Sequence, residues 1–149
     1  MEQKMKEYRF YGWRTARVRD ELGLTPCDYY DLLAESWCAE TCAPRMRKDW
    51  TEANRTLGQC SVTAFLIQDI YGGKVYGVPL EDGNYHCFNE VNGCVFDLTS
   101  EQFGETRLDY THCPEQDRAK HFAREEKKAR YELLKERLLS VRNALVKQK

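Results

Sequence analysis

This sequence contains few histidines and prolines, and its net charge is small. Its 149 residues include 3 histidines and 4 prolines, and the formal net charge at pH 7 is −1. A total charge so close to zero gives no reason to expect nucleic acid as a partner. No apolar run approaches the roughly 18 residues of a membrane span, and the polar start at Met1–Lys4 is unlike a signal peptide. We therefore expect a cytoplasmic protein that does not associate with membranes.

Cysteine is abundant by contrast, with 7 residues. Because this number is odd and no export signal is visible, reduced thiols are expected rather than disulfides. Cys38 and Cys42 are four residues apart in a segment, 27–43, that has helical periodicity, and such a pair supplies two of the four ligands of a structural zinc. No pair has the close spacing of a zinc ribbon, so the sequence predicts neither a metal nor another cofactor. A zinc-stabilised domain is the alternative, with further ligands drawn from Cys27, Cys87, Cys94, His112 and Cys113.

The length favours a single domain over residues 1–149, built from three parts. Residues 1–25 are an N-terminal extension in which aromatic residues alternate with arginines. We interpret this extension as a helix docked by its aromatic side chains, and a surface that stacks on nucleic acid is the alternative. Residues 27–113 form the core, and residues 118–149 form a long C-terminal helix that packs on the rest of the domain. The apolar stripe of that helix consists of Tyr131, Leu134, Leu138, Val141 and Leu145.

The chain is organised around one cysteine, Cys60, which stands between a glycine turn and an apolar helix. Gly58 can adopt backbone angles closed to other residues, and the apolar period after Cys60 fits a buried helix that stops at Gly72 and Gly73. Unpaired N–H groups and the positive end of the helix dipole both stabilise a thiolate, the nucleophilic form of cysteine. Taken alone, however, such a cysteine is more often a small buried apolar residue.

Alternating residues after the helix predict a three-stranded antiparallel sheet joined by two hairpin turns. If Asn92 and Gly93 are the central residues of the second turn, the strands pair so that His86 and Asp97 are diagonal neighbours, roughly 5–7 Å apart at Cβ. We expect the face that carries both side chains to pack against the N-terminal end of the cysteine helix. The three strands are predicted over residues 74–80, 85–91 and 94–99.

Together, Cys60, His86 and Asp97 have the residue types that nucleophilic acyl transfer requires. The sulfur attacks an acyl carbon, the imidazole moves the proton, and the carboxylate orients the imidazole and stabilises its cation. Each residue also has a structural explanation: His86 can be a histidine packed in a strand, and Asp97 a carboxylate beside a turn. Their order and register favour the joint, catalytic interpretation. The developing oxyanion needs fixed donors, for which the Cys60 N–H is one candidate and the side chains of Gln59, Asn54 and Asn89 are further oxyanion or orienting candidates.

Three short motifs resemble the YunG-like bacterial family. They are the Gly-Gln-Cys stretch at 58–64, the His-Cys-Phe-Asn stretch at 86–89 and the Asp-Leu-Thr stretch at 97–103, and the tail at 130–135 is similar as well. More broadly, the order of cysteine helix, histidine strand and aspartate strand is similar to papain-like and transglutaminase-like enzymes. Those papain-like enzymes place an oxyanion-hole glutamine six residues before the cysteine, where this chain has Asn54.

The sequence therefore predicts an α+β fold: a buried central helix that carries Cys60 at its N-terminus, a small antiparallel sheet packed on it, and N- and C-terminal helices. The resemblance implies a papain-like or transglutaminase-like core. The predicted function is cysteine-dependent acyl transfer through a thioester, which covers hydrolysis, deamidation and transglutamination of a small-molecule, peptide or protein substrate. The alternative is a non-catalytic binding module that retains the fold.

Overall fold

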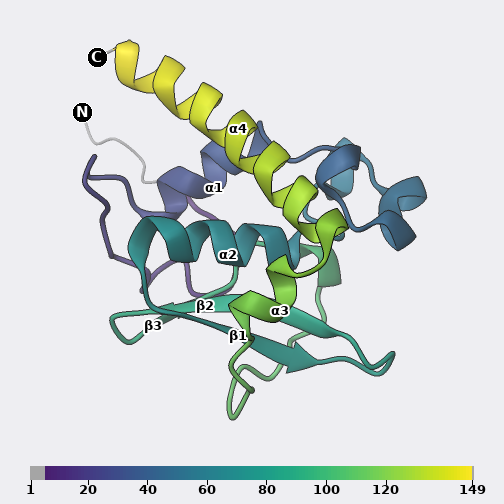
Figure 1. Ribbon diagram of the computed structural model, residues 1–149. Helices are drawn as coiled ribbons and strands as arrows, with labels where there is room; N and C mark the ends of the chain where they lie inside the picture. The colour runs from purple at the N-terminus through teal and green to yellow at the C-terminus, as the bar shows by residue number, and fades with distance from the viewer. Residues whose placement is uncertain (1–5, 149) are drawn as a thin grey trace.

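The structure is a computed structural model that describes residues 6–148, and its centre is a helix lying on a three-stranded sheet (Figure 1). The described chain forms one helix and three short 3₁₀ turns before the central helix α2, then the sheet and a fourth 3₁₀ turn, and it ends in two further helices. The helices are α1 (Pro26–Ala34), α2 (Cys60–Tyr71), α3 (Arg118–Phe122) and α4 (Glu125–Lys147). The strands are β1 (Lys74–Pro79), β2 (Tyr85–Val91) and β3 (Cys94–Phe96), and the 3₁₀ turns are η1 (Ala39–Thr41), η2 (Pro44–Asp49), η3 (Glu52–Asn54) and η4 (Ser100–Phe103).

The sheet has the strand order β1-β2-β3, antiparallel throughout, as the two hairpins predict. Asn92 has a φ of 51° and Gly93 a φ of 82°, and this pair of left-handed residues is what a two-residue hairpin turn requires. The turn fixes the pairing of Glu90 with Val95, so the predicted register is confirmed.

β3 ends three residues earlier than predicted, at Phe96. Asp97, the next residue, does not pair with β2. It forms an isolated antiparallel bridge with Tyr11 instead, and its backbone N–H donates to the Tyr11 carbonyl over 3.0 Å. A segment almost ninety residues earlier in the chain therefore continues the sheet where β3 stops, and no local pattern in the hairpin could have shown this.

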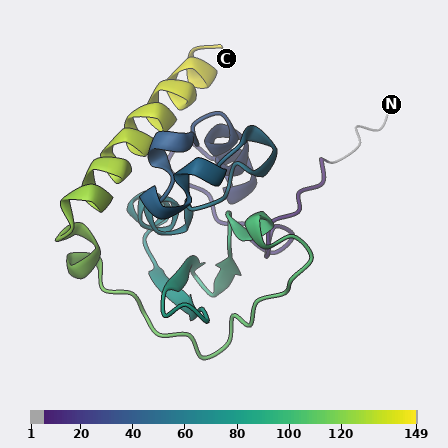
Figure 2. The same cartoon turned by 90° about the vertical axis from the view of Figure 1, so that its right-hand side faces the viewer.

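The sheet face that meets α2 is also not the predicted one. Val75, Cys87 and Val91 lie on the buried face toward α2, and the side-chain amide of Asn89 donates to the backbone carbonyl of Ala64 in that helix over 2.8 Å. Because successive residues of a strand point to opposite sides, the neighbouring positions of β2 point away from α2. That opposite face is covered by residues 104–117, which pass around the sheet on the side away from α2 (Figure 2).

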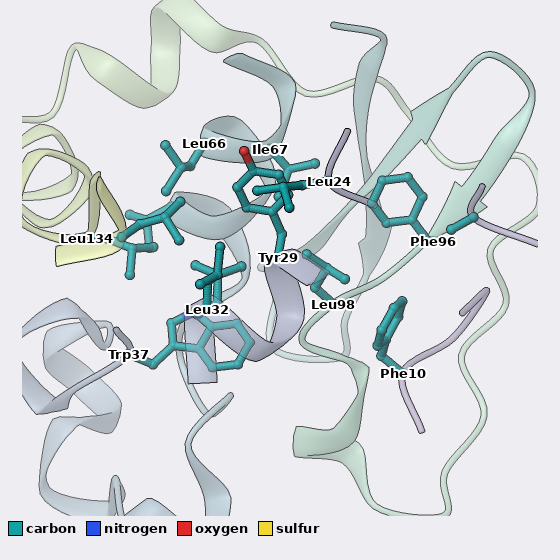
Figure 3. Packing of buried hydrophobic residues seen from close by; sticks show 14 of the residues in the cluster. Phe10, Leu24, Tyr29, Leu32, Trp37, Leu66, Ile67, Phe96, Leu98 and Leu134 are labelled. Carbon is teal, nitrogen blue, oxygen red and sulfur yellow. The ribbon is translucent and has the colours of Figure 1, made fainter. Parts of the chain in front are cut away.

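The main hydrophobic core lies between α1, α2, α4 and the N-terminal segment, and a smaller cluster lies between α2 and the sheet. Figure 3 shows the main core, in which Phe10 and Phe96 lie near Leu98, and Leu134 reaches in from α4. Tyr131, Leu134 and Leu138 are buried there, so the C-terminal helix packs on its own domain as predicted.

The N-terminal segment is not a helix, which corrects the prediction for the part of it that is described, residues 6–25. It is held by its aromatic residues, as expected: the Phe10 side chain is fully buried. At Gly12, where φ is 83°, an added Cβ would stand 2.2 Å from the backbone oxygen of Val95. This close approach requires glycine, and it locks residues 10–12 against the end of β3.

Two predicted helices are shorter or broken in the structure. The helix expected over 27–43 begins at Pro26 behind a Thr25 cap and ends at Ala34, so Cys38 and Cys42 flank a short 3₁₀ turn instead of sharing a helix face. The long C-terminal helix is interrupted at Ala123 and Arg124, which separate α3 from α4. Within the described residues, no helix is long and apolar enough to cross a membrane.

Candidate active site

Cys60 is the first residue of α2, where the sequence predicts it. The turn before it needs Gly58, because φ is 69° there and a Cβ would stand 2.5 Å from the Cys42 sulfur. Gln59 occupies the N-cap position without a side-chain cap, so the first N–H groups of α2 have no capping side chain. These groups and the helix dipole concentrate positive potential at the Cys60 thiol.

His86, the second residue of β2, and Asp97, which follows β3, form a buried pair, and each is 1% exposed. His86 Nε2 donates to Asp97 Oδ2 over 2.6 Å, so the diagonal contact predicted from the hairpin is present. The ring of Phe103 meets the imidazole edge-on, with centroids 4.7 Å apart, and restricts its rotation. Since Nε2 is engaged by the carboxylate, Nδ1 is the ring nitrogen left for Cys60.

The Cys60 sulfur approaches β2 at its first residues. It lies 4.0 Å from the carbonyl oxygen of Tyr85, next to the peptide group that joins Tyr85 to His86. His86 and Cys87 project to opposite sides of the strand. The sulfur lies at the strand end, and hydrogen bonding from both side chains favours its ionised form.

The pKa values of the two thiols at the site, Cys60 and Cys87, are shifted in opposite directions. Hydrogen bonding from Cys87 is the largest cause that holds the pKa of Cys60 well below the ordinary cysteine value, and the hydrogen bond and charge of His86 act in the same direction against burial. The same contact and burial hold the pKa of Cys87 well above the ordinary value. Cys87 therefore remains a protonated donor, and Cys60 is the thiolate of the pair.

The imidazole is held in its protonated form. Burial by itself lowers the pKa of His86, but the charge and hydrogen bond of Asp97, followed by those of Cys60, raise the pKa of His86 to about 10. Both pKa shifts favour a thiolate beside an imidazolium, which is the charge state that a nucleophilic cysteine needs.

Every lone-pair direction of the Asp97 carboxylate has a partner. Oδ1 accepts from the Thr99 backbone N–H at 3.1 Å and from its hydroxyl at 3.3 Å, and Oδ2 accepts from Tyr110 Oη at 2.7 Å in addition to His86. Burial, reinforced by Asp97, raises the pKa of Tyr110, so its hydroxyl is retained as a donor. Such a network fixes the carboxylate and, through it, the imidazole.

The three candidate oxyanion or orienting side chains lie in different places. Gln59 is fully buried, and its amide nitrogen donates to the carbonyl of Cys38 over 3.0 Å, which ties the turn to the preceding loop. Asn89 ties β2 to α2 through the carbonyl of Ala64. Asn54 is the last residue of η3, and within the described part of the chain its side chain makes no hydrogen bond. None of the three is hydrogen-bonded to Cys60, His86 or Asp97 among residues 6–148.

Several residues that support the site were not singled out from the sequence. Tyr110 lies in a stretch without regular structure, and nothing local marks it. Cys87 was considered only as a metal ligand. Thr99 had a usable signal, because an Asp-x-Thr triplet favours the side-chain turn that Asp97 forms. Within the described residues, no group of three His, Cys, Asp or Glu side chains is placed to hold a metal ion.

An α+β domain with a cysteine at the N-terminus of its central helix and a buried histidine–aspartate pair beside it is the class that this structure defines. Residues 25–143 match the family model described as YunG protein, so the chain belongs to the YunG family. Among curated proteins, the uncharacterized protein YunG of Bacillus subtilis (strain 168) is 37% identical over 83 residues. The match spans 56% of this chain and 66% of that relative, just under two thirds of its length. No solved structure gives a significant match.

Proposed function

We propose that this protein is a cysteine-dependent acyl-transfer enzyme in which Cys60 is the nucleophile, His86 the acid–base and Asp97 the residue that orients His86. The observation that carries the proposal is the buried His86–Asp97 pair, 2.6 Å from Nε2 to Oδ2, beside the cysteine that opens α2. A buried ion pair of this kind is costly to maintain, and sites where it perturbs pKa values are frequently functional.

Acylation begins with the thiolate of Cys60, whose electron pair forms a bond to the carbonyl carbon of the substrate. The carbonyl π electrons move to oxygen, and the uncapped N–H groups at the start of α2 are the donors nearest to this oxyanion. When the tetrahedral species collapses, the bond to the leaving group breaks. The His86 imidazolium supplies the proton that an amine leaving group requires, and a thioester on Cys60 remains.

Deacylation reverses the direction of proton transfer. His86, now neutral, takes a proton from water or from an acceptor amine as that nucleophile attacks the thioester carbon. The carbon–sulfur bond then breaks, and Cys60 returns as the thiolate beside the imidazolium. Asp97 keeps its charge throughout and stabilises the imidazolium that forms at the end of each cycle. Water as acceptor gives hydrolysis or deamidation, and an amine gives transglutamination.

A papain-like or transglutaminase-like core is the finer part of this proposal. Three features support it: the cysteine opens a helix, the histidine is on a neighbouring strand, and the imidazole nitrogen Nε2 is bound to the third residue, so that Nδ1 is available to the sulfur. The chain departs from the papain-like pattern at the position six residues before the cysteine, where Asn54, in η3, stands in place of the oxyanion-hole glutamine.

Alkylation with iodoacetamide tests the proposal without knowledge of the substrate. At about pH 6 an ordinary thiol is almost entirely protonated, so Cys60 should be alkylated well before the six other cysteines, as followed by peptide mass spectrometry. His86→Ala should slow this reaction at least tenfold, whereas His112→Ala, at an exposed histidine, should leave it unchanged. A transient acetyl adduct on Cys60 after addition of p-nitrophenyl acetate would establish the thioester step. Equal alkylation of all seven thiols would refute the proposal and favour a binding module.

A further inference from the structure

Cys87 is a second thiol at the Cys60 site, and the proposed acyl transfer gives it no covalent step. It lies on the face of β2 that packs on α2, in the small cluster with Ala64, Phe65 and Val75, and Cys60 packs against the same cluster. The side chain of Cys87 is 6% exposed, whereas that of Cys60 is partly exposed to solvent. Both side chains carry free thiols. One accessible and one covered thiol therefore meet where α2 and β2 begin.

The Cys60 sulfur is held directly against Cys87. The thiol of Cys87 donates a hydrogen bond to this sulfur, and the backbone N–H of Cys87 donates to it as well. The carbonyl oxygen of Tyr85, two residues earlier in β2, lies 4.0 Å from the same sulfur. These three groups of one strand segment hold the two sulfurs in contact, which is the first requirement for a disulfide between them.

The ionisation of the two thiols gives them different roles toward an oxidant. The contacts with Cys87 and His86 lower the pKa of Cys60, and the thiolate is the form of cysteine that a hydroperoxide oxidises. The hydrogen bond to Cys60, followed by burial, raises the pKa of Cys87, so this thiol stays protonated and is not the first to be oxidised. An accessible thiolate with a second thiol beside it is the arrangement that makes cysteine oxidation reversible.

We propose that Cys60 and Cys87 form a reversible oxidation site, in which a small hydroperoxide such as hydrogen peroxide oxidises Cys60 and Cys87 captures the product as an intramolecular disulfide. In the first step, the Cys60 thiolate attacks one peroxide oxygen and the O–O bond breaks. The departing hydroxide takes the proton of the His86 imidazolium and leaves as water, so Cys60 becomes a sulfenic acid.

The second step closes the disulfide. The Cys87 sulfur attacks the Cys60 sulfur, the S–O bond breaks, and the hydroxide that leaves takes the Cys87 proton to form a second water. The two thiols together lose two electrons, which the peroxide oxygens gain. Two molecules of a small thiol such as glutathione return these electrons by thiol–disulfide exchange and restore both cysteines. The disulfide thus withdraws the nucleophile and protects it from irreversible oxidation to the sulfinic acid.

Peroxide treatment of the wild-type protein tests the proposal without any variant. The protein is exposed to a small excess of hydrogen peroxide, digested without reduction and mapped by peptide mass spectrometry. A peptide pair joined through Cys60 and Cys87 should appear, iodoacetamide labelling of Cys60 should be lost, and dithiothreitol should restore this labelling. A disulfide from Cys60 to Cys42, whose sulfur borders the turn at Gly58, or oxidised Cys60 without any disulfide, would overturn the proposal.

Substitution of each candidate partner separates capture from simple oxidation. Cys87→Ser retains a hydrogen-bond donor but cannot form the disulfide, so the sulfenic acid of Cys60 should persist and react with dimedone. Longer exposure should convert it to a sulfinic acid that dithiothreitol does not reduce. Cys113→Ser, at a thiol that bonds to the carbonyls of Asp109 and Thr111, should behave as the wild type. Recovery is measured as the fraction of oxidised Cys60 that dithiothreitol restores, and equal recovery in Cys87→Ser and the wild type would overturn the proposal.

The oxidation site and the acyl-transfer proposal fail separately. If the disulfide between Cys60 and Cys87 forms but p-nitrophenyl acetate leaves no acetyl group on Cys60, acyl transfer is refuted and the oxidation site stands. If the acetyl adduct forms but peroxide gives no such disulfide, only the oxidation site is refuted.

Discussion

Replacing Asp97 with asparagine is the sharpest test of how the site sets its charge state. The substitution retains the size of the side chain and an oxygen for the Thr99 hydrogen bonds, but it removes the negative charge next to His86. The pKa of His86, about 10 in the folded protein, compares with an ordinary value of about 6.5. This difference corresponds to about 5 kcal/mol in favour of the imidazolium, with Asp97 its main cause. Without Asp97, the imidazolium that stabilises the Cys60 thiolate is lost.

The pH dependence of the effect follows from the direction of each change. In the wild type, the depressed pKa of Cys60 preserves the thiolate as the pH falls below the ordinary cysteine range. In Asp97→Asn, the thiol loses the part of this shift that comes from the hydrogen bond and charge of His86 and keeps the part that comes from Cys87, so its pKa rises and the thiolate fraction at pH 6 falls. A less acidic thiol is also a better nucleophile, by about 0.4–0.5 decade for each pH unit of pKa. The gain in nucleophilicity offsets part of the lost ionisation, so the alkylation rate at pH 6 should fall severalfold.

The same reasoning predicts that the order of the two proteins reverses in alkali. At about pH 9.5 both thiols are largely ionised, and the less acidic thiol of Asp97→Asn should react at least as fast as the wild type. The assay is the rate of iodoacetamide alkylation of Cys60 from about pH 5 to pH 10, with thermal melting to confirm that the variant is folded.

Asp109→Asn is the matched control for this prediction. Asp109 accepts from the backbone N–H and hydroxyl of Thr111, the same Asp-x-Thr turn that Asp97 forms, but it is exposed and makes no contact with His86. Its variant should follow the wild-type profile throughout. An Asp97→Asn profile parallel to the wild type, without a crossing point, would refute the view that the carboxylate acts through the ionisation of His86.

Two further predictions concern the neighbours of this pair. Cys87→Ala removes the thiol hydrogen bond that most lowers the pKa of Cys60, so alkylation of Cys60 at about pH 6 should fall severalfold and recover at high pH. The control Cys113→Ala should leave the alkylation rate unchanged. An unchanged pH profile for Cys87→Ala would show that Cys87 does not influence the Cys60 thiol. Gly12→Ala combines a φ of 83° with a Cβ 2.2 Å from a backbone oxygen, and it should lower the free energy of unfolding by about 2–5 kcal/mol. Gly83→Ala, with a φ of 86° and open space around the added Cβ, should lower the free energy of unfolding by only about 1–2 kcal/mol. Urea titration measures both variants, and equal losses of stability would contradict the packing described for the N-terminal segment.

Local chemistry explains which parts of this structure could be predicted from the sequence. Asn92 and Gly93 both need left-handed angles, and a two-residue turn with those angles permits one register, so the approach of His86 to Asp97 followed from the turn alone. The start of α2 at Cys60 was predictable for a similar reason, because Gly58 and the apolar period set it within a few residues.

Contacts between distant segments explain what was missed. The alternation in β2 defines two faces but does not say which one α2 covers, and both are largely buried: one beneath α2, the other beneath residues 104–117. The end of β3 depends on Tyr11, and the carboxylate of Asp97 depends on Tyr110, which lies in a segment without regular structure. The burial of His121 likewise depends on a distant contact, because its ring packs on Phe65 only where α3 folds back on α2.

The bridge between Tyr11 and Asp97 has a consequence for biosynthesis. The first of these residues leaves the ribosome long before the second, so the carbonyl of Tyr11 stays without its native partner until the second hairpin has been made. Contacts of such large sequence separation slow folding. A nascent chain halted before residue 97 would therefore contain Cys60 and His86 without the carboxylate that holds the imidazole, and its N-terminal segment would have no residue 97 to bridge to.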